Sequence, residues 1–261
     1  MKFVNQLTNA LEMKVIIDRN GKEYIADLMD PIDISIPLRS GELNVNAWYC
    51  PPVKIEPVIM DGWIGDVSQG GLVNFRNVLL NPHGNGTHTE CVGHISKEQF
   101  TLNNCLKRFN FLSKVISITP QAIGDDLVIT KDLIANSLTE KIEALIIRTN
   151  PNPNEKINKH YSNTNPPYID SDAMRFIVSM GVNHLLIDLP SVDKEKDDGK
   201  LAAHHIFWNY PEDIRKDCTI SELIYVPDAI DDGLYLLNLQ ITSLENDASP
   251  SKPVLYTLKN Q

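Results

Sequence analysis

The sequence predicts a single mixed α/β domain built around a substantial β-sheet, and three features favour this fold class. The 261 residues are enough for one large core. Apolar runs at 111–118, 143–148 and 184–188 are typical of buried strands. Helix-like segments at 131–138 and 172–180 lie among them, without the strict alternation of strand and helix that marks an all-parallel sheet.

The first strands are expected near the N-terminus, where residues 14–28 hold two short apolar runs on either side of Asn20-Gly21. That dipeptide is a strong signal for a tight hairpin turn. We therefore expect residues 1–30 to include an N-terminal hairpin extension of one domain that spans 1–261. A short strand over 33–37, which ends at a proline, should follow.

Residues 40–72 are rich in glycine, proline and tryptophan and form a long excursion between predicted strands. Loops of this length inside compact domains usually serve a function.

A strand and a helix are expected on either side of residue 90. Residues 75–82 look like a strand, and Ser96 with Gln99 has capping-box spacing, which predicts a helix after residue 94.

Capping residues mark the two helices expected in the second half of the chain. Thr130 and Ser171 suit the N-cap positions of the two helix-like segments, and Gly181 fits the position after the second. The last expected strands are an alternating run and a short apolar run, at 234–242 and 254–258.

The composition excludes several classes of function. A net charge of -10 argues against a general role in binding nucleic acid, which needs a basic surface. The sequence contains no apolar stretch long enough to cross a membrane and no secretory-type N-terminus. The four cysteines show no CxxC pairing and are expected to be reduced thiols. A cytoplasmic protein with a small-molecule substrate is the expectation.

The residues that carry chemistry gather at 83–94, which reads HGNGTHTECVGH. Three of the seven histidines lie there beside Glu90, and two more are adjacent at 204–205. Imidazole and carboxylate are the ordinary ligands of zinc and manganese-like ions. The sequence therefore predicts a divalent metal site, with zinc expected first and manganese second.

Side-chain parity indicates which residues of this segment could share an ion. In an extended strand His88 and Glu90 project from the same face, whereas His83 has the wrong parity. A bulge at Gly84-Asn85-Gly86 would correct the register and bring His83 to the ligand face. His160 and His184 are interpreted as structural histidines.

The segment resembles the metal-binding signature of the cyclase family, which includes kynurenine formamidase and isatin hydrolase and has the form His-x-Gly-Thr-His-x-Asp-x-Pro-x-His. Other runs are similar to family segments in the correct order. These are Asp33-Ile34-Ser35-Ile36-Pro37-Leu38, Leu145-Ile146-Ile147-Arg148-Thr149, Asp188-Leu189-Pro190-Ser191-Val192-Asp193, Ala203-His204, Ile220-Ser221-Glu222-Leu223 and Asp247-Ala248-Ser249-Pro250.

The resemblance implies a swivelling β/β/α fold, a homodimer or homotetramer, one or two metal ions and a set of site residues. Glu90 and Glu222 would be able to bridge two ions, His94 would be the general acid/base, and Trp48 would contact the substrate. The implied ligands are His88, Glu90, His204 and Glu222, and His83 is expected to join them if the bulge forms; with a regular segment the site would rest on these four residues.

The resemblance also implies the reaction, which is hydrolysis of an amide-type C–N bond by metal-activated water. An aryl formamide such as N-formylkynurenine would be the substrate. Opening of a cyclic amide (lactam), or binding without turnover, is the alternative. Ser191 lacks the Gly-x-Ser-x-Gly elbow of a nucleophile.

This chain departs from the family pattern near the signature. Glu90 replaces the usual Asp, Val92 replaces the usual Pro, and His83 lies one residue further from His88. The stretch between His204 and Glu222 is also longer than usual. The departures indicate a divergent branch of the family.

Overall fold

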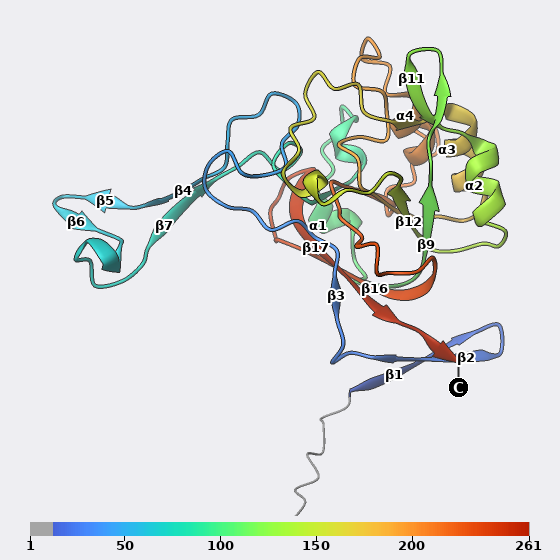
Figure 1. Cartoon of the computed structure of the whole chain (residues 1–261), viewed down its shortest axis with the longest axis horizontal. Coiled ribbons are helices and arrows are strands. Elements are labelled where there is room, and N and C mark those ends of the chain that lie inside the picture. Colours follow the sequence, from blue (N-terminus) through green and yellow to red (C-terminus); the bar gives the residue numbers. More distant parts are fainter. Residues whose placement is uncertain (1–12, 261) are drawn as a thin grey trace, which may run out of the picture.

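The computed structural model describes residues 13–260, and its centre is a mixed β-barrel (Figure 1). Pairing of the first and seventh strands of the main sheet closes the barrel, and the eighth strand, β3 (Ile32–Asp33), adds to the outside of β17. The barrel strands, in spatial order, are β16 (Gly233–Ile241), β9 (Asn110–Ile118), β12 (Ala144–Thr149), β14 (His184–Ile187), β15 (Thr219–Glu222), β8 (His88–Glu90) and β17 (Ala248–Thr257). The mixed α/β class is therefore confirmed, while the swivelling type stays a prediction.

Four neighbouring barrel strands, β9, β12, β14 and β15, run parallel. The chain passes between them through α2 (Lys131–Ser137), α3 (Ser171–Ser179) and α4 (Ala202–Trp208), which lie together on one side of the barrel (Figure 1). The expectation of no strict alternation of strand and helix is confirmed, because short strands over Gln121–Ile123, Asp126–Ile129 and Tyr168–Ile169 interrupt it even here. The helices have only seven to nine residues and stand among longer irregular loops, which dilutes their pattern in the sequence.

The core has two layers because the central strands are buried on both faces. In β12, Leu145 and Ile147 pack against the helices, whereas Ala144 and Ile146 point into the barrel with Leu186. Burial of a large aliphatic side chain contributes about 1.5–3 kcal/mol, so these layers hold the strand ends rigidly in place.

The N-terminal hairpin is present as β1 (Lys14–Arg19) and β2 (Lys22–Asp27), which turn at Asn20 and Gly21, both at positive φ. It forms a small sheet with β18 (Lys259–Asn260). Residues 1–12 of the expected extension lie outside the described residues.

Other expected strands and helices also appear, some of them shifted. The runs at 111–118, 143–148, 184–188, 234–242 and 254–258 lie in barrel strands. The helix α3 begins one residue early, because Asp170 and not Ser171 caps it by accepting from the Ala173 amide. Gly181 follows α3 at positive φ, as predicted.

Three local predictions need correction. The capping box at Ser96 does not start a helix, because the Ser96 hydroxyl donates to the Glu98 carbonyl instead; the next helix, α1 (Leu102–Cys105), begins later. The strand expected over 33–37 shortens to β3. The strand expected over 75–82 is reduced to β7 (Arg76–Leu79), which is not part of the barrel.

The excursion after residue 40 folds into a protruding arm. β7 pairs with β4 (Lys54–Pro57), and beyond them β5 (Ile59–Met60) pairs with β6 (Trp63–Ile64). A short 3-10 helix at Val67–Gln69 lies near the tip, and the whole arm extends away from the barrel (Figure 1).

A separate small sheet contains β10 (Gln121–Ile123), β11 (Asp126–Ile129) and β13 (Tyr168–Ile169). None of the helices within residues 13–260 is long and apolar enough to cross a membrane.

A buried ion pair fixes the carboxyl ends of β12 and β14. The Lys156 ammonium donates to the Asp188 carboxylate at 2.8 Å and to the Thr149 carbonyl at 2.6 Å. The Lys156 side chain is 10% exposed and that of Asp188 is fully buried. Burial raises the pKa of Asp188, and the Lys156 charge opposes that rise.

We expect Lys156→Met to lower the free energy of unfolding by about 3–5 kcal/mol, because it leaves the Asp188 carboxylate buried without its cation. Urea unfolding at neutral pH measures the change. Lys159→Met is the matched control, since Lys159 is exposed with its ammonium over the Tyr161 ring, and should cost about 1 kcal/mol or less. Equal losses in the two variants would contradict the assignment.

Candidate metal centre

The strand β8 supplies the floor of the candidate site. It pairs with β15 on one side, where Glu222 lies opposite His88, and with β17 on the other. His88 and Glu90 project together, because a group formed by His88, Glu90 and Glu222 brings one ligand atom of each within 4.8 Å of the others. Thr89 points the other way and shares a hydrogen bond of 2.7 Å with Ser221. The prediction that the side chains of His88 and Glu90 project from the same face of the strand is confirmed.

The His88 ring shows that this group suits a cation. Its Nδ1 lies 3.1 Å from the Gly86 carbonyl oxygen and therefore carries the proton, which leaves a lone pair on Nε2. This Nε2 is buried and finds no hydrogen-bond partner within residues 13–260. It faces a Glu222 carboxylate oxygen at 3.5 Å. Two electron-rich atoms held together in a buried place are stabilised by a cation between them.

His204 enters the same site from α4, fully buried. Its Nε2 lies 3.1 Å from Oε1 of Glu90 and 3.9 Å from Glu222. Its Nδ1 lies 2.6 Å from Asp193, which also accepts from the backbone N–H of His204 at 3.1 Å. A carboxylate on the far nitrogen fixes the ring and its tautomer, as is usual for a histidine that binds metal.

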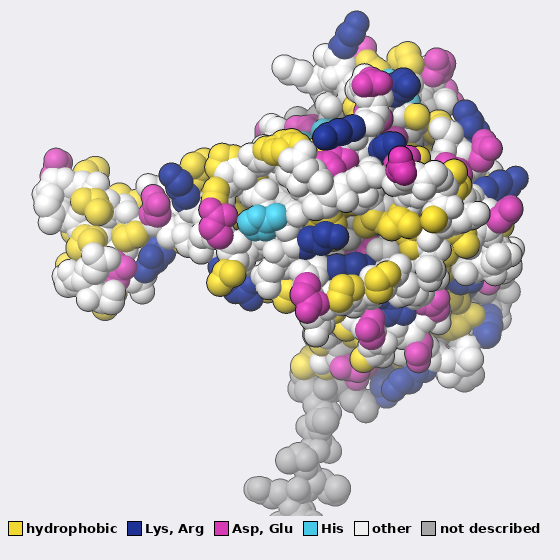
Figure 2. All heavy atoms as spheres, turned by 45° about the horizontal axis from the view of Figure 1, so that its top comes forward, with side chains coloured by type: hydrophobic (Ala, Val, Ile, Leu, Met, Phe, Trp, Pro, Cys, Tyr) yellow, Lys and Arg dark blue, Asp and Glu magenta, His cyan; other side chains and the backbone are white. Residues whose placement is uncertain are grey.

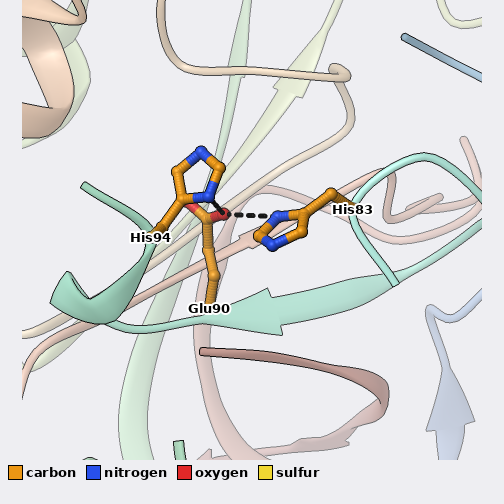
Figure 3. Close-up of side chains that lie close together, drawn as sticks. All are labelled: His83, Glu90 and His94. Atoms are coloured by element: carbon orange, nitrogen blue, oxygen red, sulfur yellow. Dashed lines mark ion pairs between the residues drawn. The ribbon is translucent and has the colours of Figure 1, made fainter. Parts of the chain in front are cut away.

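A second group lies beside the first, nearer the surface. His83, Glu90 and His94 place ligand atoms within 4.8 Å of one another, and Figure 3 shows the Glu90 carboxylate between the two rings. His83 Nδ1 lies 3.1 Å from Oε2 of Glu90, and His94 Nδ1 lies 3.7 Å from the same oxygen. Asp247 contacts both histidines as well, at 2.8 Å from Nε2 of His83 and 3.6 Å from Nδ1 of His94.

Glu90 belongs to both groups, so the site contains two adjoining positions with one shared carboxylate. Its Oε1 faces His204 and its Oε2 faces His83. Glu90 is therefore the residue that both groups share, while the bridging of two ions stays a prediction. Glu222 has one oxygen toward His88, while its other oxygen accepts from the Val192 amide at 3.0 Å.

Without a metal ion, protonated histidines balance the negative charge of the carboxylates in the site. Burial would lower the pKa of His204, but hydrogen bonds to Asp193 and Glu90 raise it to about 10. Burial acts likewise on His83, and Asp247 with Glu90 raises its pKa to about 10. Burial would raise the pKa of Glu90, but the surrounding histidines hold it well below its usual value. The site thus stabilises positive charge.

The segment before β8 is a turn and not a bulged strand, so the predicted bulge is wrong. β8 begins only at His88, and Gly86 has a φ of +90°. The Asn81 side chain caps the turn by accepting from the amides of His83 and Gly84. A Cβ on Gly84 would lie 2.8 Å from the Ala47 carbonyl, so only glycine fits. The turn brings His83 to the site by a different route.

A pocket of about 330 Å³ opens over the two groups. It is lined by Trp48 and Cys50 from one side, by Ser191, Lys194 and Leu201 from another, and by the cluster residues His83, Glu90, His94, His204 and Glu222. Trp48 thus lies on the pocket wall, and its contact with a substrate stays a prediction. Its φ of 58° shows that the backbone there is held in a left-handed conformation.

The remaining histidines lie elsewhere. His184 is buried against Phe111 and the Thr219 hydroxyl, and its pKa falls to about 3 because of burial and the nearby Arg108 and Arg215 charges. His160 is exposed and contacts the Glu42 carbonyl. His205 turns away to the Tyr210 carbonyl. The interpretation of His160 and His184 as structural histidines agrees with these positions.

Sequence reasoning missed two carboxylates that support the cluster. Asp193 holds His204, and Asp247 contacts His83 and His94. Both lie in runs that resemble the family, but nothing in their spacing marks them as partners of histidines far along the chain. Only the structure shows how Asp247 reaches the site. Asp247 directly precedes Ala248, and Ala248 pairs with Glu90 across β17 and β8.

Comparisons with known proteins identify the family of this chain. The sequence profile of the Cyclase family matches residues 32–194. The kynurenine formamidase of Bacillus cytotoxicus is 27% identical over 195 residues, which cover 73% of this chain and 83% of that protein. That of Bacillus cereus is 26% identical over 230 residues, covering 86% and 96%.

Solved structures show the same fold at low sequence identity. Isatin hydrolase A from Labrenzia aggregata, bound to benzyl benzoate, aligns with a TM-score of 0.65 at 14% identity, covering 88% of this chain and 94% of that one. A structure described as a potential metal-dependent hydrolase with cyclase activity aligns with a TM-score of 0.63 at 16% identity, covering 87% and 97%.

Proposed function

The chain belongs to the cyclase family, and from this membership and its His/Glu cluster we propose that it is a metal-dependent hydrolase of a small-molecule amide C–N bond. The observation that carries the proposal is the orphaned, buried Nε2 of His88 facing the Glu222 carboxylate. We propose an aryl formamide such as N-formylkynurenine as substrate, because the relatives that match along most of this chain are kynurenine formamidases.

The residues present fit one or two divalent ions, with zinc first and manganese second. His88, His204 and Glu222 would hold one position, His83 would hold the other, and Glu90 would serve both. Such an ion polarises a carbonyl group and lowers the pKa of water. The mixed imidazole and carboxylate donors are those that zinc and manganese accept.

The chain's own residues can then move the proton. His94 is 30% exposed at the pocket, so its ring can reach both water and a bound amide. It would take a proton from the attacking water and deliver it to the leaving nitrogen. Imidazole suits both transfers because its ordinary pKa is near neutrality. Glu90 and Asp247 both lie near Nδ1 of His94, at 3.7 and 3.6 Å, and orient the ring from that one side.

The pocket supports a compact substrate with an apolar part. Its volume of about 330 Å³ is at the small end of the range for ligand sites. Trp48 offers an aromatic wall beside the cluster, against which an aryl group could pack. The same chemistry would open a lactam, so cyclic amides are the second class of substrate to test.

The test combines metal analysis with a substrate screen. We expect protein purified without chelator to contain about one or two divalent ions per chain. The metal-replete protein should hydrolyse aryl formamides, and chelator-treated protein is the matched control. Hydrolysis of lactams alone would transfer the assignment to the cyclic amides. Bound metal with no hydrolysis of either class would identify a ligand-binding homologue. Less than a tenth of an equivalent after reconstitution would refute the metal site.

A further inference from the structure

A second pocket, called the basal pocket below, opens at the opposite end of the barrel strands from the metal centre. Its volume is about 550 Å³, and it shares no lining residue with the pocket over the metal centre. Its lining includes His184, the first residue of β14, and Cys218, which directly precedes β15. Glu222 of the metal centre is the last residue of β15, roughly 10 Å along that strand from its first residue. The basal pocket is therefore separate from the candidate active site.

The basal pocket is rich in positive charge, although the chain as a whole has a net charge of -10. Arg108 is paired with Glu143, whereas the other basic side chains of the lining form no ion pair within residues 13–260. Figure 2 shows basic side chains interspersed with acidic ones over one face of the molecule, so the pocket differs from that face. Four cations against the carboxylates of Asp217 and Glu143 leave an excess of two positive charges, which attracts anions. The charged lining residues are Lys107, Arg108, Arg215, Lys216 and Asp217.

Two of these cations are held in position by their neighbours. The Arg215 guanidinium donates to the carbonyl oxygens of Phe207 at 2.5 Å and of Val182 at 2.6 Å. The Arg108 guanidinium lies 5.4 Å from the centre of the Phe111 ring, in addition to its ion pair. Side chains that are already ordered lose little conformational entropy when a ligand binds. The positive charge of the pocket is therefore partly preorganised.

The floor of the basal pocket presents an open hydrogen-bonding atom. His184 is 4% exposed, and its ring packs on Phe111 with the ring centroids 3.9 Å apart. Its Nδ1 lies 2.9 Å from the Thr219 hydroxyl, while its Nε2 makes no hydrogen bond within residues 13–260 and is not sealed from solvent there. Burial and the charges of Arg108 and Arg215 lower the pKa of His184 to about 3, so the ring is neutral near neutral pH. When Thr219 donates to Nδ1, Nε2 carries the ring proton and can donate it to an anion.

We propose that the basal pocket is a binding site for a small organic anion, in which a carboxylate or phosphate group is joined to an apolar part. The anionic group lies between the basic rim and the His184 Nε2, and the apolar part contacts Leu106, Phe111 and Ile214, which line the same space. The volume is within the range of about 300–1,000 Å³ that is typical of small-molecule sites, and an inorganic ion would leave most of it empty. This site is independent of the proposed hydrolase activity.

Calorimetric titration of the metal-replete protein tests the proposal, with benzoate and phenyl phosphate as probes. At least one of them should bind with a Kd below about 1 mM, and the neutral benzyl alcohol and inorganic phosphate should each bind at least ~10-fold more weakly. The double variant Arg108→Met/Lys216→Met should raise the Kd of the bound probe at least ~10-fold, because hydrogen bonds between charged groups are the stronger ones. Lys131→Met/Arg175→Met is the matched control and should leave the Kd unchanged. Arg175 is paired with Asp172, and its side chain is 62% exposed, compared with 66% for Arg108.

Nuclear magnetic resonance of the wild-type protein locates the probe without any variant. The imidazole signals of His184 should shift as the probe is added, and they should shift equally after chelator treatment, because the two pockets share no residue. Four results would each overturn the proposal. They are no binding of either probe, equal affinity for benzyl alcohol or inorganic phosphate, equal weakening in the control variant, and binding that requires metal and leaves the His184 signals unchanged.

Discussion

Replacing His88 with alanine should remove metal and activity together. His88 is fully buried, its Nδ1 is engaged by the Gly86 carbonyl, and its Nε2 faces Glu222 without a hydrogen-bond partner within residues 13–260. Loss of a partner outside the ligand shell already costs about 10–100-fold in metal affinity, so loss of this ligand should cost at least about 100-fold. Elemental analysis and metal titration measure the first effect, and formamide hydrolysis measures the second.

The matched control is His160→Ala, which removes an exposed histidine that contacts the Glu42 carbonyl. It should keep the metal content and the activity of the parent protein. Circular dichroism should show that His88→Ala is folded, because a buried cavity alone can destabilise the chain. A folded His88→Ala protein that binds metal as tightly as its parent would show that the centre does not use His88.

Sequence reasoning placed the side chains of His88 and Glu90 together because successive side chains of a strand point to opposite faces. His88 and Glu90 alternate with Thr89, and the structure has a strand at these three residues. His204 and Glu222 came only from the resemblance, since their approach depends on α4 and on the carboxyl end of β15. No periodicity brings residues 114 positions apart within 3.1 Å, as with His204 and Glu90.

His83 shows why local reasoning fails next to the same strand. Parity required a bulge, but the chain turns before the strand begins, and Gly84 packs against the Ala47 and Cys50 region of the preceding excursion. That contact joins parts of the chain more than thirty residues apart. The barrel itself was not foreseen for the same reason, since its closure rests on the pairing of β16 with β17 and on the position of β8 between β15 and β17.

The arm illustrates the opposite case. The sequence predicted that the long segment after residue 40 has a function. However, the apolar residues of this segment resemble those of ordinary strands. Only the structure shows that β4 and β7 leave the barrel and bury none of them. A hydrophobic pattern in the sequence therefore does not by itself place a residue in the core of this chain.

Replacing His94 with alanine should lower activity by roughly 10²–10⁴-fold, which is the usual contribution of a general acid or base. Metal content should stay near that of the parent protein. The reason is position: His94 is 30% exposed, and its Nδ1 lies 3.6–3.7 Å from Asp247 and Glu90. Each other histidine of the cluster lies nearer to its nearest carboxylate. The buried donors at His88, His204, Glu90 and Glu222 are untouched by the change.

The competing assignment is that His94 is itself a ligand, because it forms a group with His83 and Glu90. The two roles separate in the ratio of metal content to activity. A proton-transfer residue gives a metal-loaded protein with a low kcat, whereas a ligand gives a metal-poor protein whose activity returns at high metal concentration. His205→Ala is the matched control, since His205 is a partly buried histidine turned to the Tyr210 carbonyl and away from the cluster. Equal metal loss in His94→Ala and His88→Ala would place His94 among the ligands.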